Sequence, residues 1–149
     1  MEITDFLTPD RVILEVRSRD KPQLIGEIAR NLARQVPALR PETVETALLA
    51  REQLGSTGLG GGFALPHARI EGLQSFIGLF VRLAKPIEFD AIDGKPVQLV
   101  FALLIPSDGT TPHVAALAAI SRRFRDPELV TNLRGSKTHL EAYGFLTRT

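Results

Sequence analysis

The sequence contains no cysteine and carries almost no excess charge, and both features exclude whole classes of protein. Without cysteine there can be no disulfide, no thiolate zinc site and no cysteine nucleophile. A net charge of +1 at pH 7 provides no broad basic field, so nucleic acid is not an expected partner. A small domain without cysteine is compatible with the cytoplasm.

Long hydrophobic runs are missing as well. The longest apolar run, Leu99–Ile105, is far short of the roughly 20 residues that a membrane-spanning helix needs. The first residues include Glu2 and Asp5 and lack the basic and apolar regions of a secretory signal. We therefore expect a cytoplasmic protein without membrane insertion.

The composition is that of an ordinary globular protein. Of 149 residues, 44% are hydrophobic and 23% are charged, which is enough to build a core in a chain as long as one typical domain. Two predicted strands, Phe76–Leu83 and Val97–Ile105, are apolar on both faces. Strands buried on both sides are typical of a sheet covered by helices. The sequence therefore predicts one α/β domain spanning residues 1–149.

Local signals place most of the other elements. A strand is expected at Arg11–Val16, followed by a helix capped by Asp20 and ended by Pro37. A second helix should begin at Pro41 and stop at Gly55. The glycine cluster over 55–62 is predicted to be irregular. Further predictions are an extended segment at Phe63–Pro66 and a tight turn at Asp93-Gly94. Three helices should follow: one at Thr111–Phe124, a shorter one after a break at Pro127 and before Gly135, and one at Thr138–Phe145.

In the first of these last three helices, Thr111 can act as the cap, with Pro112 at the first helical position. The apolar face of this helix is predicted to consist of Val114, Leu117, Ala118, Ser121 and Phe124.

Common cofactor and metal motifs are broken or missing. Gly58–Phe63 resembles the start of a dinucleotide fingerprint, but Phe63 stands where the third glycine should be. The only Gly-Lys pair, Gly94-Lys95, is followed by Pro96 and cannot begin a nucleotide P-loop. The three histidines lack metal-ligand spacing. We expect neither a cofactor nor a metal.

His67 is the strongest candidate for chemistry. Pro66 fixes the backbone just before it, and a neutral imidazole nitrogen can attack a phosphoryl group. Backbone N–H groups of Gly60, Gly61 and Gly62 could approach the incoming oxygens. The alternative is a loop histidine held by a structural hydrogen bond.

Two further residues fit a phosphate site. His113, near the start of a predicted helix, sits where the helix dipole disfavours imidazolium and attracts anions. Arg51 lies on an otherwise apolar helix face and must reach a carboxylate, a carbonyl or a phosphate. The alternatives are a partly exposed first-turn histidine and an arginine that snorkels at the C-terminus of its helix, where the dipole favours it. His139 is interpreted as a surface histidine.

These residues lie in segments that resemble a known family. Arg51–His67, with the sequence REQLGSTGLGGGFALPH, resembles the phosphorylation site of the fructose/mannitol-type enzyme IIA domains of the bacterial phosphotransferase system. Pro86–Val97 and Phe101–Pro106, with His113 soon after, resemble the same family. Together they most resemble its nitrogen-regulatory branch.

The resemblance implies a mixed β-sheet flanked by helices and a histidine that a histidine phosphocarrier protein phosphorylates. By position, His67 would be the phosphorylated residue, and Arg51 and His113 its phosphate-side neighbours. The chain departs from the family in two places. It has Ala68 where a glycine commonly follows the active histidine, and Gly61 where a polar residue often interrupts the glycine run.

The nitrogen-regulatory resemblance favours a regulator whose binding to target proteins depends on phosphorylation of His67. The alternative is a free-standing sugar-transport component that passes the phosphoryl group to a fructose- or mannitol-type enzyme IIB. A scaffold without phosphorylation is disfavoured, because all three site residues are present. We expect the carrier to dock on an apolar patch formed by Leu59, Phe63 and Ile70.

Overall fold

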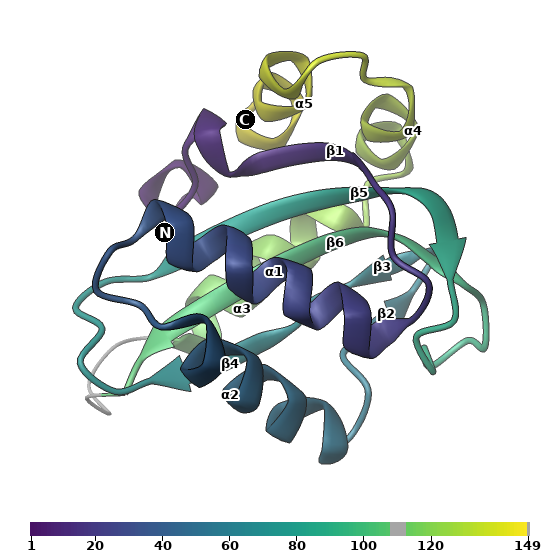
Figure 1. Ribbon diagram of the computed structural model, residues 1–149. Helices are drawn as coiled ribbons and strands as arrows, with labels where there is room; N and C mark the ends of the chain where they lie inside the picture. Colours follow the sequence, from purple (N-terminus) through teal and green to yellow (C-terminus); the bar gives the residue numbers. More distant parts are fainter. Residues whose placement is uncertain (108–112, 149) are drawn as a thin grey trace.

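Six strands in the part of the chain that the structure describes form one mixed sheet with helices on both faces (Figure 1). The structure is a computed structural model and describes residues 1–107 and 113–148. The predicted α/β fold with a mixed sheet is confirmed. The strands are β1 (Val12–Val16), β2 (Gly58–Gly60), β3 (Phe63–Ala64), β4 (His67–Ile70), β5 (Ile77–Ile87) and β6 (Val97–Pro106). The helices are η1 (Ile3–Asp5), η2 (Pro9–Arg11), α1 (Lys21–Gln35), α2 (Pro41–Gln53), α3 (His113–Phe124), α4 (Pro127–Gly135) and α5 (His139–Thr147).

Strand β6 is the centre of the sheet. On one side it pairs antiparallel with β5, which in turn pairs parallel with β1. On the other side it pairs parallel with both β3 and β4, which follow one another along its length. Phe63 lies opposite Leu99, and His67 lies opposite Leu103. His67 is therefore the first residue of a strand that is anchored to the most buried strand of the sheet.

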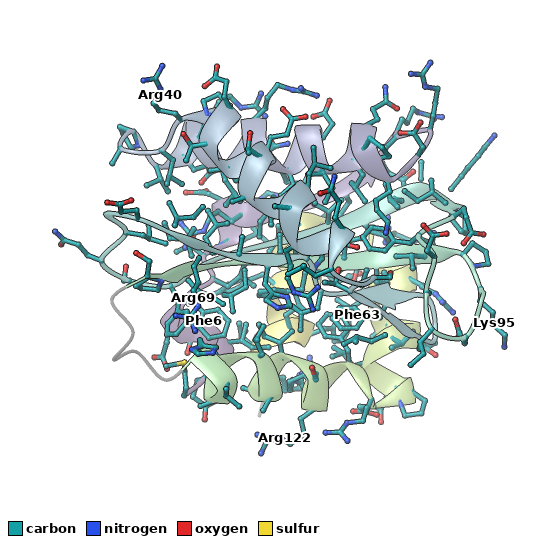
Figure 2. The ribbon with its side chains drawn as sticks, turned by 90° about the horizontal axis from the view of Figure 1, so that it is seen from below. Phe6, Arg40, Phe63, Arg69, Lys95 and Arg122 are labelled. Carbon is teal, nitrogen blue, oxygen red and sulfur yellow. The ribbon has the colours of Figure 1, made fainter. Side chains whose placement is uncertain are left out.

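The two faces of the sheet carry two separate apolar layers, because successive side chains of a strand point to opposite faces. Leu79, Val100 and their neighbours on the same face pack under α1 and α2. Phe80 and Phe101 belong to the opposite layer, which includes α3, α4, α5 and the N-terminal segment. Figure 2 shows the sheet edge-on between these layers. On β4, alternation puts Ala68 in the first layer and His67 on the other face.

The predicted cap of α1 is confirmed, and α2 and α4 begin at the prolines near which the sequence places their starts. The Asp20 carboxylate accepts a hydrogen bond from the Gln23 backbone N–H at 2.9 Å and caps α1. Pro41 and Pro127 are the first residues of α2 and α4, where a missing N–H costs nothing. The predicted Thr111 cap and Pro112 lie outside the described residues. No helix in the described ranges is both long and apolar enough to cross a membrane.

The glycine cluster is more regular than we expected. Gly58–Gly60 forms β2, which pairs antiparallel with β3 and makes a small hairpin. Gly61 and Gly62 turn the chain with φ values of 66° and 80°, a region in which only glycine is free of steric strain. Strand β5 also runs past the predicted end at Leu83, to Ile87, and β4 was not predicted at all.

The predicted apolar face of α3 is only partly right: Phe124 is buried and Leu117 packs against the second layer, but the remaining predicted residues are not its buried side. The helix buries Ala116, Ile120 and Phe124 and leaves Val114 exposed. Phe124 stacks on Phe63 of β3 with ring centroids 3.9 Å apart, and this contact sets the rotation of the helix. Apolar residues lie nearly all the way round α3, so periodicity alone could not select the buried side.

A substitution at Gly78 of β5 probes how tightly the second apolar layer is packed. A Cβ atom at this position would lie 2.8 Å from Cε1 of the fully buried Phe101 ring. We expect Gly78→Ala to lower the free energy of unfolding by about 1–3 kcal/mol, because the core must shift to admit the methyl group. Urea unfolding measures the loss.

Gly144→Ala is the matched control, because nothing lies within 4 Å of the added Cβ on α5. It should be neutral or stabilise by up to about 1 kcal/mol, since alanine favours helix. Equal effects of the two substitutions would contradict the packing argument.

Candidate functional site

Three residues that are distant in the sequence meet in one groove. Arg51 at the end of α2, His67 at the start of β4 and His113 at the start of α3 line a groove of about 740 Å³. The groove lies at the edge where β4 emerges between the two helix layers. The fold thus brings together the three side chains that the sequence singled out, although 113 − 67 = 46 positions separate the two histidines.

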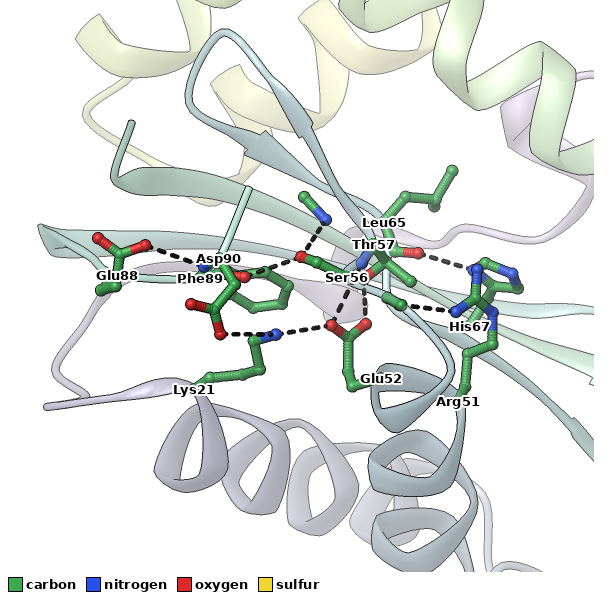
Figure 3. Close-up of polar contacts among 12 residues, drawn as sticks. Lys21, Arg51, Glu52, Ser56, Thr57, Leu65, His67, Glu88, Phe89 and Asp90 are labelled. Carbon is green, nitrogen blue, oxygen red and sulfur yellow. Dashed lines mark hydrogen bonds and ion pairs between the residues drawn. The ribbon is translucent and has the colours of Figure 1, made fainter. Parts of the chain in front are cut away.

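The His67 ring is held by a backbone carbonyl. Its Nδ1 lies 2.8 Å from the Leu65 carbonyl oxygen (Figure 3). A carbonyl can only accept, so Nδ1 must carry the hydrogen. In the neutral ring the lone pair is then on Nε2, which makes Nε2 the nucleophilic nitrogen. This hydrogen bond is compatible with both interpretations of the sequence, because it is structural and it also selects the reactive atom.

The surroundings of His67 favour its neutral form. Burial lowers the pKa of His67 below its ordinary value of 6.5, and the positive charge of Arg51 and the nearby His113 lower it further. The Leu65 hydrogen bond and the negative charge of Glu52 act in the opposite direction. The net shift is downward, so the ring is neutral near pH 7 and its Nε2 lone pair is available.

Arg51 serves the end of its own helix and faces the groove. Its Nη1 donates to the carbonyl oxygen of Gly55, in the segment that follows α2, at 2.8 Å. One of the five guanidinium N–H donors is thereby used. Arg51 therefore ties the end of α2 to the segment that follows it, and still places a positive charge beside His67 (Figure 3).

Arg69 is a site residue that the sequence analysis missed. Its Nη2 lies 3.3 Å from Nδ1 and 3.1 Å from Nε2 of His113. Arg69 follows His67 by two positions on β4, so both side chains project from the same face. Figure 2 shows Arg69 between the sheet and α3. Recognising 67–70 as a strand would have revealed it. The groove thus contains two guanidinium groups.

The structure does not bring the three glycines to this groove. The Gly61 N–H donates to the Asp93 carboxylate at 3.0 Å, and Gly60 also lies against Asp93. Gly62 lies next to the Arg134 side chain. None of the three lines the groove that His67 and Arg51 share. The hairpin carries its turn away from the histidine, and we assign no phosphoryl contact to these glycines.

The exposed apolar side chains around the groove differ from the predicted patch. Leu59 is half-exposed as expected, but Phe63 and Ile70 are buried and cannot form a footprint. The groove is instead bordered by Leu54 and Val114, which are 85% and 68% exposed. Leu54 directly follows α2 and Val114 is the second residue of α3, so apolar surface flanks His67 from both helices.

The third histidine lies elsewhere. His139 begins α5, is exposed as expected, and is not among the residues that line the groove. Within residues 1–107 and 113–148, no three histidine, aspartate or glutamate side chains are gathered so that they could hold a metal ion.

Comparison with known proteins identifies relatives along nearly the whole chain. The family described as "Phosphoenolpyruvate-dependent sugar phosphotransferase system, EIIA 2" matches residues 5–148. The "Nitrogen regulatory protein" of Escherichia coli is 42% identical over 150 aligned positions, covering 100% of this chain and 91% of that protein. The protein of the same name from Bradyrhizobium diazoefficiens is 38% identical, covering 98% and 95%. The crystal structure of nitrogen regulatory protein IIA-Ntr from Neisseria meningitidis superimposes with a TM-score of 0.91 at 36% identity, covering 97% and 99%.

The lowered pKa of His67 has a measurable consequence. Between the folded pKa and the ordinary value of 6.5, the unfolded chain binds more protons than the folded one. The stability contributed by this residue is therefore complete above pH 6.5 and lost as the pH falls through the folded pKa. We expect the His67 ring to titrate below 6.5 by NMR.

Urea unfolding provides the second measurement. From about pH 7.5 to about pH 5.5, the wild-type protein should lose more stability than a His67→Gln variant, which has no titrating group at this position. A ring that titrates at or above 6.5, or parallel pH profiles for the two proteins, would contradict the assigned environment.

Proposed function

Because this chain belongs to the phosphoenolpyruvate-dependent sugar phosphotransferase system EIIA 2 family, and to its nitrogen-regulatory type, we propose that it accepts a phosphoryl group on His67 in the cytoplasm. The donor is a histidine phosphocarrier protein of the HPr type. The observation that carries the proposal is the Leu65 hydrogen bond, which keeps the ring hydrogen on Nδ1 and leaves the lone pair of Nε2 free as the nucleophile.

The proposed transfer is an exchange of one nitrogen–phosphorus bond for another. Nε2 of His67 attacks the phosphorus of the carrier's phosphohistidine, the new N–P bond forms, and the carrier's N–P bond breaks in line with it. The carrier's phosphorylated ring carries a hydrogen on its other nitrogen, so it leaves as neutral imidazole, and His67 retains its Nδ1 hydrogen on the Leu65 carbonyl. No proton has to move during the transfer. Such transfers depend mainly on alignment and on stabilisation of charge on the phosphoryl oxygens.

The charged neighbours of His67 supply that stabilisation. Arg51 retains guanidinium N–H donors beyond the one bound to Gly55, and planar guanidinium groups suit phosphoryl oxygens. His113 lines the same groove and is proposed to donate a hydrogen bond to the phosphoryl group. Arg69, in contact with His113, brings a second guanidinium to the site.

The surface around the groove supports a protein as the donor. Leu54 and Val114 expose apolar side chains on either side of His67. A small anionic donor would gain nothing from such a border, whereas a docking protein can bury it. The nearby arginines would meet the transferred phosphoryl group when the carrier is bound.

We propose a regulatory role, in which target proteins distinguish the phosphorylated from the unphosphorylated form. Support comes from relatives named nitrogen regulatory protein, which align along nearly the whole of this chain. A phosphoryl dianion changes the charge of the groove and adds strong hydrogen-bond acceptors at a single point. A partner that buries Leu54 or Val114 would register that change directly.

The acceptor assignment can be tested by reconstitution. The purified protein is incubated with phosphoenolpyruvate, the first phosphotransferase enzyme and the carrier, and its intact mass is measured. Wild type should gain one acid-labile phosphoryl group, and His67→Ala should gain none because the only proposed nucleophile is gone. His139→Ala, which removes an exposed histidine from another surface, should match wild type. Phosphorylation of the His67→Ala protein would show that another residue is the acceptor.

Docking can be separated from chemistry by changing the donor. Leu54→Gln should slow phosphorylation by the carrier roughly five- to tenfold, about 1.0–1.4 kcal/mol, because an interface leucine loses its burial. Phosphorylation by phosphoramidate, a small donor that needs no docking surface, should be unchanged. Leu140→Gln changes an exposed leucine of α5 and should affect neither donor. Equal losses with both donors would show that Leu54 shapes the site itself.

A further inference from the structure

A buried carboxylate lies directly behind the histidine. The Glu52 side chain, in the last turn of α2, is only 5% exposed. One oxygen lies 3.0 Å from the Lys21 Nζ and 3.2 Å from the Thr57 backbone N–H, which donates to it. The other accepts a hydrogen bond from the Thr57 hydroxyl. Figure 3 shows this network between α1, α2 and the segment that leads to β2.

Helix stability does not explain where these two charges lie. Glu52 is next to the last residue of α2, where the helix dipole disfavours a negative charge. Lys21 is the first residue of α1, where the dipole disfavours a positive charge. Burial of both charges adds a desolvation cost that an apolar pair would avoid. The hydrogen bonds that the Glu52 carboxylate accepts from Thr57 give a reason for the position of the two charges.

Hydrogen bonds connect Glu52 to the His67 ring through the backbone. Glu52 binds both the N–H and the hydroxyl of Thr57. The Thr57 carbonyl accepts from the Leu65 N–H at 3.0 Å. The Leu65 carbonyl accepts from His67 Nδ1 at 2.8 Å. Each link is short and directional, so the position of the carboxylate is transmitted to the ring.

Glu52 also acts on His67 through space. Burial, Arg51 and His113 all lower the pKa of His67, and Glu52 raises it. The other charged or titratable side chains that line the groove with His67 are Arg51, Arg69 and His113. Among the groups that act on His67, the negative charge of Glu52 therefore opposes the effect of these positive groups on its pKa.

We propose that Glu52 is a positioning residue for His67: its carboxylate fixes Thr57, and through Thr57 the Leu65 carbonyl that orients the ring by accepting the Nδ1 hydrogen. The proposal rests on the proposed function in that the oriented atom, Nε2, is the phosphoryl acceptor. Glu52 is buried beneath the groove and touches neither the phosphoryl group nor the carrier.

The test compares Glu52→Gln with Glu42→Gln, an exposed glutamate on the same helix. In Glu52→Gln the His67 ring should titrate at lower pH than in wild type by NMR, because the negative charge that raises its pKa is gone. The maximal rate of phosphorylation by the carrier should fall about tenfold or more, because a misplaced nucleophile loses alignment. The carrier concentration that gives half the maximal rate should not change. Glu42→Gln should match wild type in all three measurements.

Thr57→Val keeps the proposal testable if Glu52→Gln does not fold. Valine has nearly the same shape and removes only the hydroxyl, while the backbone N–H can stay on Glu52. This variant should slow the maximal rate and leave the pKa of His67 near its wild-type position, since the carboxylate charge remains. A wild-type maximal rate of phosphorylation in Thr57→Val would overturn the proposal that Glu52 acts on His67 through Thr57.

Two further outcomes would overturn the proposal. One is a Glu52→Gln protein in which His67 titrates as in wild type and the rate is unchanged. The other is a loss of rate that disappears at high carrier concentration, because Glu52 would then act on docking. The NMR measurement needs no phosphoryl donor. If wild type accepts no phosphoryl group, the proposed function fails, and the titration still decides whether Glu52 acts on His67.

Discussion

The hydrogen bond from His67 Nδ1 to the Leu65 carbonyl, 2.8 Å long, is the contact on which the rest of the site depends. It determines which ring nitrogen holds the hydrogen and therefore which one can react. The carbonyl is itself fixed, because the Leu65 N–H bonds to Thr57 and the Pro66 carbonyl accepts from Leu103 of β6 at 2.9 Å. The ring is thus tied both to the sheet and to the end of α2.

The arrangement of the sheet explains why the histidine is accessible although it is anchored so firmly. β3 and β4 pair with the same edge of β6, and Leu65 and Pro66 lie between them. Proline has no backbone N–H to contribute to a ladder, so the break between the two strands falls there. His67 therefore begins β4 at the rim of the sheet, where α2 and α3 approach from opposite faces and leave a groove.

The groove combines positive charge with apolar borders, and packing elsewhere produces both. Stacking of Phe124 on Phe63 sets the rotation of α3. That rotation leaves Val114 exposed beside the groove and brings His113 to Arg69. Burial first and then the neighbouring positive groups keep the pKa of His67 low, so a neutral imidazole lies among cations that would suit a phosphoryl dianion.

Local chemistry in the sequence determined much of this protein. The starts of α1 and α2 followed from the Asp20 cap and from Pro41, because such signals act within one helical turn. The apolar strands β5 and β6 implied a sheet covered by helices. The Pro66-His67 step and the unusual Arg51 were enough to select candidate site residues. Their meeting in one groove depended on the fold.

Other features were decided by contacts between distant segments. β4 is four residues long and forms because β6 supplies its hydrogen bonds, so no local pattern predicted it. No local pattern gave the Gly61 N–H a partner, but in the folded protein it donates to Asp93, 32 positions away. In the sequence Glu52 is indistinguishable from an ordinary helical glutamate, and only the fold places Lys21 and Thr57 against its carboxylate. Partners such as these are chosen by tertiary packing, which periodicity and capping along a single segment cannot encode.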